Sequence, residues 1–163
     1  LLKEYGFAAE HQLKIRAVED QRELAELYLR DKAQRENWIN TEKFNEELQA
    51  LRKTTPSVRD ELTDAEYDRY LYAMGLPNRI SVSRVMDGSA AFKAGMKEGD
   101  KIISYADSRI YTWQDMRNAT TEGNAGANVK VEIERDGQLM QVYMPRGPMG
   151  IQMGTDRYNP LPN

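Results

Sequence analysis

The chain has 163 residues, 40% of them hydrophobic and 30% charged, and 23 basic against 26 acidic side chains give a formal net charge of −3. This near balance gives no argument for nucleic acid or an anionic membrane surface, so neither is expected as a partner. The absence of cysteine excludes disulfides, thiolate metal sites and thiol nucleophiles. No apolar run approaches the roughly eighteen residues that cross a bilayer, so no membrane span is expected in this chain.

Residues 7–53 contain no proline and are rich in long, helix-favouring side chains. Apolar residues recur at steps of three and four along two stretches, first at Leu13, Ala17, Leu24, Leu27 and Tyr28 and then at Phe44, Leu48 and Leu51. This pattern predicts either one bent amphipathic helix or two, with Asn40 or Thr41 as the cap of the second. The apolar stripe either packs against its own domain or mediates self-association or binding of a partner helix.

A helical region over residues 1–76 ends with a clearly bounded helix. Thr63 and Glu66 match a capping box, in which each side chain satisfies a backbone N–H group at the start of the helix. The helix predicted over residues 64–74 stops at Gly75 and Pro77, because glycine accepts the left-handed cap and proline cannot continue a helix. A domain boundary is therefore expected near Pro77.

Beyond Pro77 the apolar period becomes that of strands. Strands are predicted over residues 79–86, 101–105 (extended weakly through 109–110), 129–133 and 139–144, the last two joined by a hairpin at Asp136-Gly137. A short helical turn is expected over residues 90–93, and Thr112 caps a second helix from Trp113 to about Glu122. The fold class is thus α+β, a small barrel or sandwich with two helices, preceded by the α-helical region.

The stretch from Gly88 to Ile103, GSAAFKAGMKEGDKII, resembles the GSPAxxAGLxxGDxIxxx signature of bacterial PDZ domains. The resemblance implies a PDZ domain over residues 77–154, followed by a flexible tail over residues 155–163. The physical roles of these residues agree with it. Gly95 and Gly99 lie where the chain reverses, and Asp100 is expected to accept backbone N–H bonds that hold the turn.

The resemblance also implies a binding groove between a strand and a helix, in which a peptide adds as an antiparallel strand and backbone amides hold its carboxylate. No carboxylate loop precedes Arg79, whereas a glycine-containing segment follows the last hairpin strand. The chain therefore resembles a permuted PDZ domain whose loop comes last. The expected carboxylate loop is Gly147, Pro148, Met149 and Gly150, the groove strand is Ile151, Gln152 and Met153, and the groove helix contributes Trp113, Arg117, Thr120 and Thr121.

Two features leave alternatives open at this site. Pro148 removes one N–H donor from the loop, so either a free C-terminus or an internal strand can be the preferred ligand. Trp113 either lines the groove or only covers a hydrophobic edge, and Arg117 either contacts a ligand carboxylate or lies in water. Met116 and Ala119, on the other side of the same helix, are expected to face the core.

Catalysis within this chain is not expected. His11 is the only histidine and has no nucleophile or triad setting around it, and a solvated position on a helix is expected for it. Ser89 belongs to the signature turn, and the carboxylates fall on helix faces rather than in an isolated apolar pair. No metal-ligand cluster and no phosphate-binding motif is present, so no cofactor is expected.

Three functions remain. The first is a protein that captures a hydrophobic protein or peptide C-terminus, as an adaptor or sensor in the bacterial envelope or periplasm. The second is a regulatory fragment of a larger envelope protease or secretion-system component whose working part precedes Leu1. The third is a structural protein that oligomerises through its helices, with a vestigial groove or one filled by residues 156–163. Because the chain begins with leucine, a signal peptide or anchor upstream would be invisible.

Overall fold

A computed structural model describes residues 1–161 and divides the chain into two compact units, Leu1–Tyr70 and Leu71–Asn163. Residues 162 and 163, the last two of the predicted tail, lie outside the described residues. No helix within residues 1–161 is both long and apolar enough to cross a membrane.

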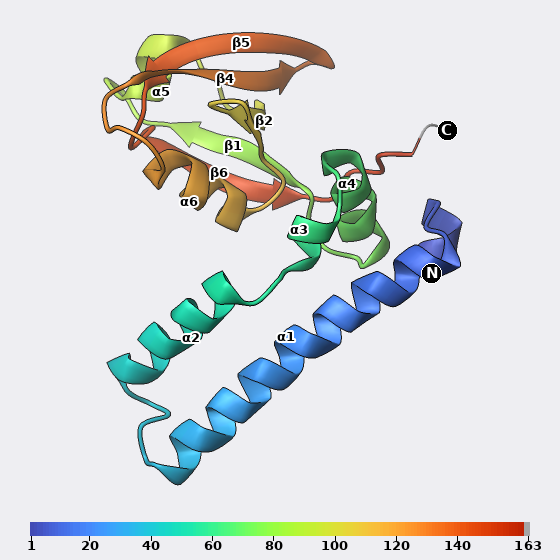
Figure 1. The fold of residues 1–163 in the computed structure, drawn as a ribbon. Helices are drawn as coiled ribbons and strands as arrows, with labels where there is room; N and C mark the ends of the chain where they lie inside the picture. The colour runs from blue at the N-terminus through green and yellow to red at the C-terminus, as the bar shows by residue number, and fades with distance from the viewer. Residues whose placement is uncertain (162–163) are drawn as a thin grey trace. The chain divides into compact units, whose positions relative to one another are not determined.

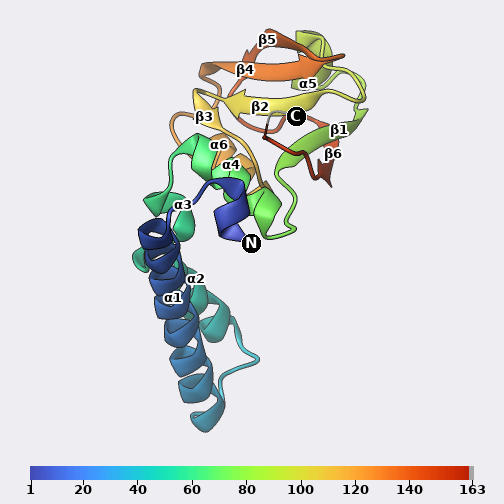
Figure 2. The same ribbon diagram turned by 90° about the vertical axis from the view of Figure 1, so that its right-hand side faces the viewer.

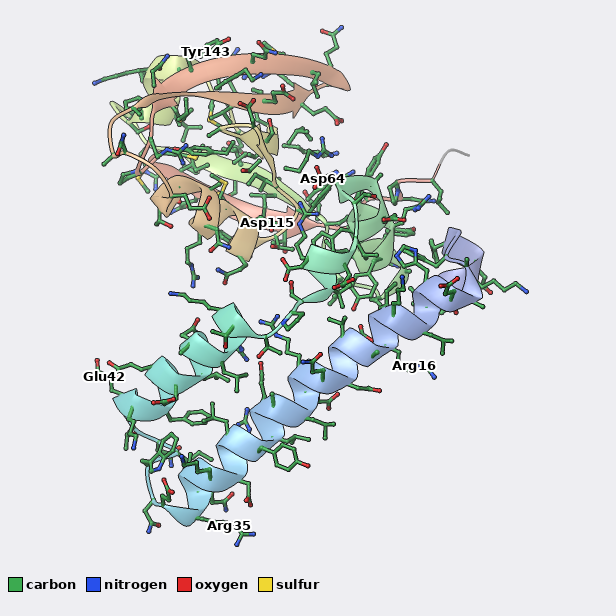
Figure 3. The ribbon with its side chains drawn as sticks, viewed as in Figure 1. Arg16, Arg35, Glu42, Asp64, Asp115 and Tyr143 are labelled. Carbon is green, nitrogen blue, oxygen red and sulfur yellow. The ribbon has the colours of Figure 1, made fainter. Side chains whose placement is uncertain are left out.

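The first unit is entirely helical. It consists of a short 3-10 helix η1 (Leu2–Tyr5), the helices α1 (Ala9–Arg35), α2 (Glu42–Thr54) and α3 (Val58–Glu61), and the first part of α4 (Asp64–Ala73). The residues from Phe7 to Lys53 thus form two helices rather than one bent helix, and Thr41 is the N-cap of the second. Helices α1 and α2 make a hairpin, which Figures 1 and 3 show.

The turn of this hairpin is held by a small apolar cluster. Ala33, Trp38 and Phe44 are buried, with Leu29 and Leu48 packed against them. The Trp38 and Phe44 ring centroids are 6.3 Å apart, and the Lys43 ammonium lies 4.6 Å from the centroid of the Trp38 ring. Trp38 therefore serves packing within this chain.

Of the alternatives for the apolar stripe, packing against its own domain does not hold for the stretch from Leu13 to Tyr28. Leu13 is 67% exposed and Tyr28 71%, and Leu24 and Leu27 are also exposed. The buried residues of α1 are Ile15 and Ala33, on another face of the helix. Since α1 carries apolar residues on more than one face, its spacing alone could not tell which face would be covered.

The second unit is built on one antiparallel sheet. Its strands are β1 (Arg79–Val85), β2 (Lys101–Tyr105), β3 (Ser108–Arg109), β4 (Asn128–Arg135), β5 (Gln138–Pro145) and β6 (Ile151–Asp156), and its helices besides the end of α4 are α5 (Ala90–Ala94) and α6 (Trp113–Thr121). The order across the sheet is β5-β4-β2-β1-β6, with β3 beside β2 (Figure 2). The predicted α+β class, a small antiparallel sheet with two helices preceded by a helical region, is confirmed.

The core of this unit lies between the sheet and α6. Its fully buried strand residues include Ile80 of β1 and Ile133 of β4, which belong to runs of alternately buried apolar residues as the sequence period predicts. Strand β2, with Ile102, instead buries four successive residues. Met116 and Ala119 of α6 are 3% and 4% exposed and belong to the same cluster, as expected. The helix is thereby fixed against the sheet by one face.

The signature segment forms the turns expected of it. Gly95 and Gly99 have φ values of 86° and 92°, which favour glycine because a side chain would be strained there. The Asp100 carboxylate accepts the Lys97 N–H at 2.8 Å, which confirms its predicted role. It also accepts two bonds from the Arg135 guanidinium, at 2.7 and 2.8 Å.

The pKa of Asp100 reflects this setting. Burial acts to raise the pKa of the carboxyl, but the bonds from Arg135 and from the Lys97 amide outweigh burial and hold the pKa below its ordinary value. The carboxylate is therefore a structural anion that joins the signature turn to β4.

The segment after β6 continues along the same unit. Strand β6 runs to Asp156, and the Asn78 side chain then exchanges two hydrogen bonds with the backbone of Tyr158, at 2.7 and 2.8 Å. The Arg157 guanidinium donates to the carbonyl of Tyr72 at 2.6 Å. These contacts attach Arg157 to α4 and Tyr158 to Asn78, the residue directly before β1.

Candidate functional site

A groove of about 420 Å³ lies between α6 and β6, two elements that Figure 1 shows next to each other. Helix α6 contributes one side, and the loop before β6 and the strand itself contribute the other. The structure brings every predicted site residue except Gln152 to this groove, and adds Met116. The lining residues are Trp113, Met116, Arg117, Thr120, Thr121, Gly147, Pro148, Met149, Gly150, Ile151 and Met153.

A capping box fixes the start of α6. The Thr112 hydroxyl accepts the Asp115 N–H at 3.2 Å, and the Asp115 carboxylate accepts the N–H groups of Tyr111 and Thr112 at 3.0 and 3.2 Å. Asp115 lies in the first turn of α6 (Figure 3). Because Met116 and Ala119 are buried, the helix presents the edge with Trp113 and Arg117 to the groove.

The loop is attached to the C-terminal end of α6 by Arg146. Its guanidinium donates to the Ala119 carbonyl, in the last turn of the helix. Its backbone bonds the segment after α6, with N–H to the Ala127 carbonyl at 2.7 Å and carbonyl to the Gly126 N–H at 2.9 Å. Arg146 was not among the site residues predicted from the sequence. A basic side chain that satisfies helix C-terminal carbonyls is a known pattern, but here it comes from a distant part of the chain.

The loop itself packs tightly on the start of α5. A Cβ atom at Gly150, whose φ is 76°, would lie 2.2 Å from the Ser89 Cβ, so a side chain does not fit there. The carbonyls of Met149 and Gly150 accept the N–H groups of Ala91 and Met86, both at 2.9 Å. The loop carbonyls therefore point into the domain.

Fewer of the loop's backbone N–H groups than of its carbonyls are hydrogen-bonded within the domain. The Gly147 N–H donates to the Tyr105 hydroxyl at 3.2 Å, and Pro148 has none. Within residues 1–161 no acceptor is bonded to the N–H groups of Met149 and Gly150. Successive unbonded amides in a glycine-containing loop form a site of partial positive charge that suits an anion.

Strand β6 offers an open edge beside the helix. The carbonyls of Gly150 and Asp156 accept the N–H groups of Met86 and Asn78, which flank β1. The even-numbered residues from 150 to 156 therefore direct their backbone groups toward β1. Backbone direction alternates along a strand, so Ile151 and Met153 direct their N–H and C=O groups to the opposite edge. Within the described residues β6 pairs only with β1, so another strand can pair there.

The same alternation explains the exception among the predicted residues. The Gln152 backbone faces β1, and its exposed side chain lies on the other face of the strand from Ile151 and Met153. Grouping residues 151–153 as one groove strand therefore included one residue that does not line the groove.

Polar chemistry in the groove is limited. Arg117 is the only charged side chain among the lining residues, and it is exposed. The hydroxyls of Thr120 and Thr121 donate to carbonyls of their own helix, at 2.9 and 2.8 Å, and so remain available mainly as acceptors. Trp113 is 45% exposed at the start of the helix. The groove is mainly apolar, with one cation and an amide-lined end.

Within residues 1–161 no group of three or more His, Cys, Asp or Glu side chains could hold a metal ion. His11 lies in the helical unit, with its Nδ1 3.6 Å from the Glu66 carboxylate and its ring packed edge-on against Phe7 at 5.7 Å. His11 is therefore half-buried rather than simply solvated.

The model of the PDZ domain family matches residues 51–144. A Pasteurella multocida protein named as a zinc metalloprotease is 34% identical over 93 residues, which are 54% of this chain and 20% of that protein. A Rickettsia prowazekii protein named as a DegP-like periplasmic serine endoprotease is 31% identical over 65 residues, 40% of this chain and 13% of that protein.

A solved PDZ domain, from the SdrC-like protein of Listeria monocytogenes, aligns with a TM-score of 0.42 and 17% identity over 47% of this chain and 87% of that one. The chain spans a fifth or less of the length of the Pasteurella multocida and Rickettsia prowazekii proteins. The family match ends at Met144, before the loop and β6.

Proposed function

This chain belongs to the PDZ domain family, and on that premise we propose that it captures a short hydrophobic peptide, C-terminal or extended, in the groove between α6 and β6. The peptide adds as an antiparallel strand to the open edge of β6. The observation that carries this proposal is the backbone direction of Ile151 and Met153, which places N–H and C=O groups on the groove side of the strand.

The two ends of the groove give the peptide a direction. The loop with the unbonded amides of Met149 and Gly150 stands at the start of β6, where a strand antiparallel to β6 would end. A terminal carboxylate placed there accepts these amides, which favours a free C-terminus as ligand. In this arrangement the domain is permuted, because its carboxylate loop and groove strand come last in the sequence.

The affinity expected of this site is modest. A peptide of a few residues buries little apolar area and loses conformational freedom when it is ordered on the strand. A dissociation constant on the order of micromolar follows. Such an affinity suits an adaptor or sensor, and the periplasmic endoprotease named among the relatives supports a location in the bacterial envelope.

A second candidate function follows from the same relatives. Both are named as proteases, and each is at least five times longer than the part this chain matches. The chain would then be the regulatory PDZ part of a larger envelope protease or secretion-system component. Reading the full-length gene separates the two, because a complete reading frame with only a signal sequence before Leu1 would exclude the larger enzyme.

The third function, a structural protein whose groove is vestigial or filled by its own tail, has less support. None of residues 157–161 lines the groove, and Tyr158 is bonded to Asn78 instead. The groove is therefore not filled by the described part of the tail.

Panning a library of peptides with free C-termini against the chain tests peptide capture. We expect enrichment of peptides with hydrophobic C-terminal residues, loss of their binding when the C-terminus is amidated, and loss in Gly150→Asp. Gln152→Ala is the control, because this residue lies on β6, two positions after Gly150, but outside the groove, and the variant should bind as the wild type does. If the folded chain enriches no peptide, the proposed function is wrong.

A further inference from the structure

We propose that α1 is a dimerisation helix, whose exposed apolar stripe packs antiparallel against the same stripe of a second copy of this chain. The stripe consists of Leu13, Ala17, Leu24, Leu27 and Tyr28. It belongs to the helical unit and is separate from the peptide groove, none of whose lining residues lies in α1. The two faces of the helix, the spacing of the stripe and the charges beside it support a second copy as the partner.

Helix α1 has one covered face and one exposed face. Helix α2 lies along one side of α1 in Figures 1 and 3, and the Glu26 carboxylate there accepts two bonds from the Arg52 guanidinium of α2, at 2.8 and 3.2 Å. Ile15, on the same face, is fully buried. At about 100° of rotation per residue, Leu13 and Leu24 lie about 160° and 180° from Ile15 around the helix. The elements of the helical unit therefore leave the stripe uncovered.

The stripe has the exposure and the spacing of a helix–helix contact. Leu13, Leu24, Leu27 and Tyr28 are 67%, 51%, 54% and 71% exposed, respectively. Ala17 and Leu24 are one heptad apart, and Leu13 and Leu27 are two heptads apart, which is the repeat that keeps side chains on one seam between two helices. A second helix on this seam would remove the leucines from water.

The charges beside the stripe fit a second copy in the antiparallel orientation. Arg16, Asp20 and Glu23 follow one edge of the stripe, and antiparallel pairing about a two-fold axis brings this same edge of both helices together. When Leu13 packs against Leu24 of the second copy, Arg16 comes opposite Asp20 and Glu23 of that copy. Within residues 1–161 none of these three charged side chains makes an ion pair. Two equivalent sets of opposite charges therefore border the contact.

A parallel pair is disfavoured by the carboxylates on the seam. In a parallel pair in register every seam residue meets its own copy, so Asp20 and Asp31 would each face an identical carboxylate. In the antiparallel pair Asp20 faces Ala17 of the second copy instead. The small alanine side chain leaves the carboxylate open to water and to Arg16 of the second copy. The antiparallel orientation is therefore the one that the charge pattern favours.

The dimer expected from this contact is weak. The stripe from Leu13 to Tyr28 covers about 22 Å of the helix axis, which gives an interface below the standard size of stable complexes. A dissociation constant on the order of 100 µM follows. At low micromolar concentration the chain is then a monomer with the stripe exposed to water.

Sedimentation equilibrium of the whole chain, from about 10 µM to about 1 mM, tests the proposal. We expect the wild type to pass from monomer to dimer over this range. Leu24→Glu should stay monomeric, because it places a carboxylate on the seam, and should keep the wild-type circular dichroism, because the residue is exposed. The matched control is Leu139→Glu, the same exchange at a 63% exposed leucine of β5, and it should dimerise as the wild type does.

Exchanging the charges at the edge of the stripe tests the orientation. Arg16→Glu and Glu23→Arg should each weaken the dimer by about ten-fold, because each variant places like charges opposite each other twice. An equimolar mixture of the two variants should recover most of the association, since each copy then presents the opposite charge to the other. Residues 16 and 23 are two turns apart on one helix, so a recovery of this kind requires contact between two copies.

Three results would contradict the proposal. A wild-type chain that stays monomeric at about 1 mM would overturn it and leave the stripe to another protein or to a lipid surface. Equal weakening by Leu24→Glu and Leu139→Glu would place the contact at β5 rather than α1. A mixture of Arg16→Glu and Glu23→Arg that recovers no association would overturn the antiparallel orientation. Peptide binding by Leu24→Glu should equal that of the wild type, so failure of peptide capture and failure of dimerisation are seen separately.

Discussion

The two units of this chain treat their apolar residues in different ways. In the PDZ unit the alternating residues of the strands, such as Ile80 and Ile133, are fully buried. In the helical unit, the most regular apolar stripe of α1, which includes Leu24, is exposed. An apolar pattern therefore predicts which residues are buried when only one face of the element is apolar, as in a sheet covered on one side. The same pattern does not predict the buried face when a helix is apolar on more than one face.

The largest expected effect is the loss of stability when a core residue of the PDZ unit is truncated, compared with truncation of a residue on the exposed stripe. Ile102→Ala should lower the free energy of unfolding of the PDZ unit by about 4 kcal/mol, because it opens a cavity in a fully packed core. Leu24→Ala, its counterpart on the exposed stripe, should cost less than about 0.5 kcal/mol. Urea unfolding of both variants measures the two values, and similar losses would mean that the stripe is covered in solution.

The next effect concerns the ion pair that joins the signature turn to β4. Asp100→Asn should destabilise the PDZ unit by about 3 kcal/mol near neutral pH, since it leaves the Arg135 guanidinium without its anion. The folded pKa of Asp100 lies below the unfolded value, so its stabilisation is present above about pH 4 and is lost as pH falls through the folded pKa.

Unfolding free energies of the wild type and Asp100→Asn should therefore differ most near pH 7 and converge in acid. A gap between them that does not change with pH would contradict the linkage to the Asp100 carboxyl.

Gly150→Ala sharpens the comparison at the groove. We expect a loss of about 2–3 kcal/mol together with loss of peptide binding, because the new Cβ meets Ser89 and the backbone has a positive φ. Gly137→Ala has a similar φ of 78° but open space around it, so it should cost about 1 kcal/mol and leave binding unchanged. Thermal unfolding and peptide titration of the two variants separate the contact with Ser89 from the strain of a positive φ. Equal losses of stability in Gly150→Ala and Gly137→Ala would mean that the positive φ accounts for the whole effect.

The smallest effect is expected from removing a capping-box hydroxyl, at Thr112 of α6 in one unit and at Ser57 of α3 in the other. Thr112→Ala removes the N-cap of α6 and should cost about 1 kcal/mol and weaken peptide binding, because the helix start carries Trp113. Ser57→Ala removes the capping box of α3 in the helical unit and should leave peptide binding unchanged. Calorimetric titration measures both, and a loss of binding in Ser57→Ala would show that the groove depends on the helical unit.

Much of the PDZ unit could be predicted because its signals are local. Thr112 with Asp115, Asp136-Gly137 and the signature from Gly88 to Ile103 each bring about a turn or cap through neighbours a few residues away. The predicted strand and helix limits accordingly differ from the structure by one or two residues in most elements, although α3 was missed and β6 extends to Asp156. The domain limits and the role of the groove residues remain predictions.

The amino-acid sequence by itself determined the class of this fold and most of the helices that precede it, because period, caps and glycine turns act over short distances along the chain. The residues expected at the groove came from the resemblance to bacterial PDZ domains. Only the tertiary structure decided that Arg146 attaches the loop to α6, that Arg135 neutralises Asp100, that Gln152 faces away from the groove and that the stripe from Leu13 to Tyr28 is exposed. Those outcomes depend on which distant elements meet, and on which face of each is left without a neighbour, and no local pattern carries that information.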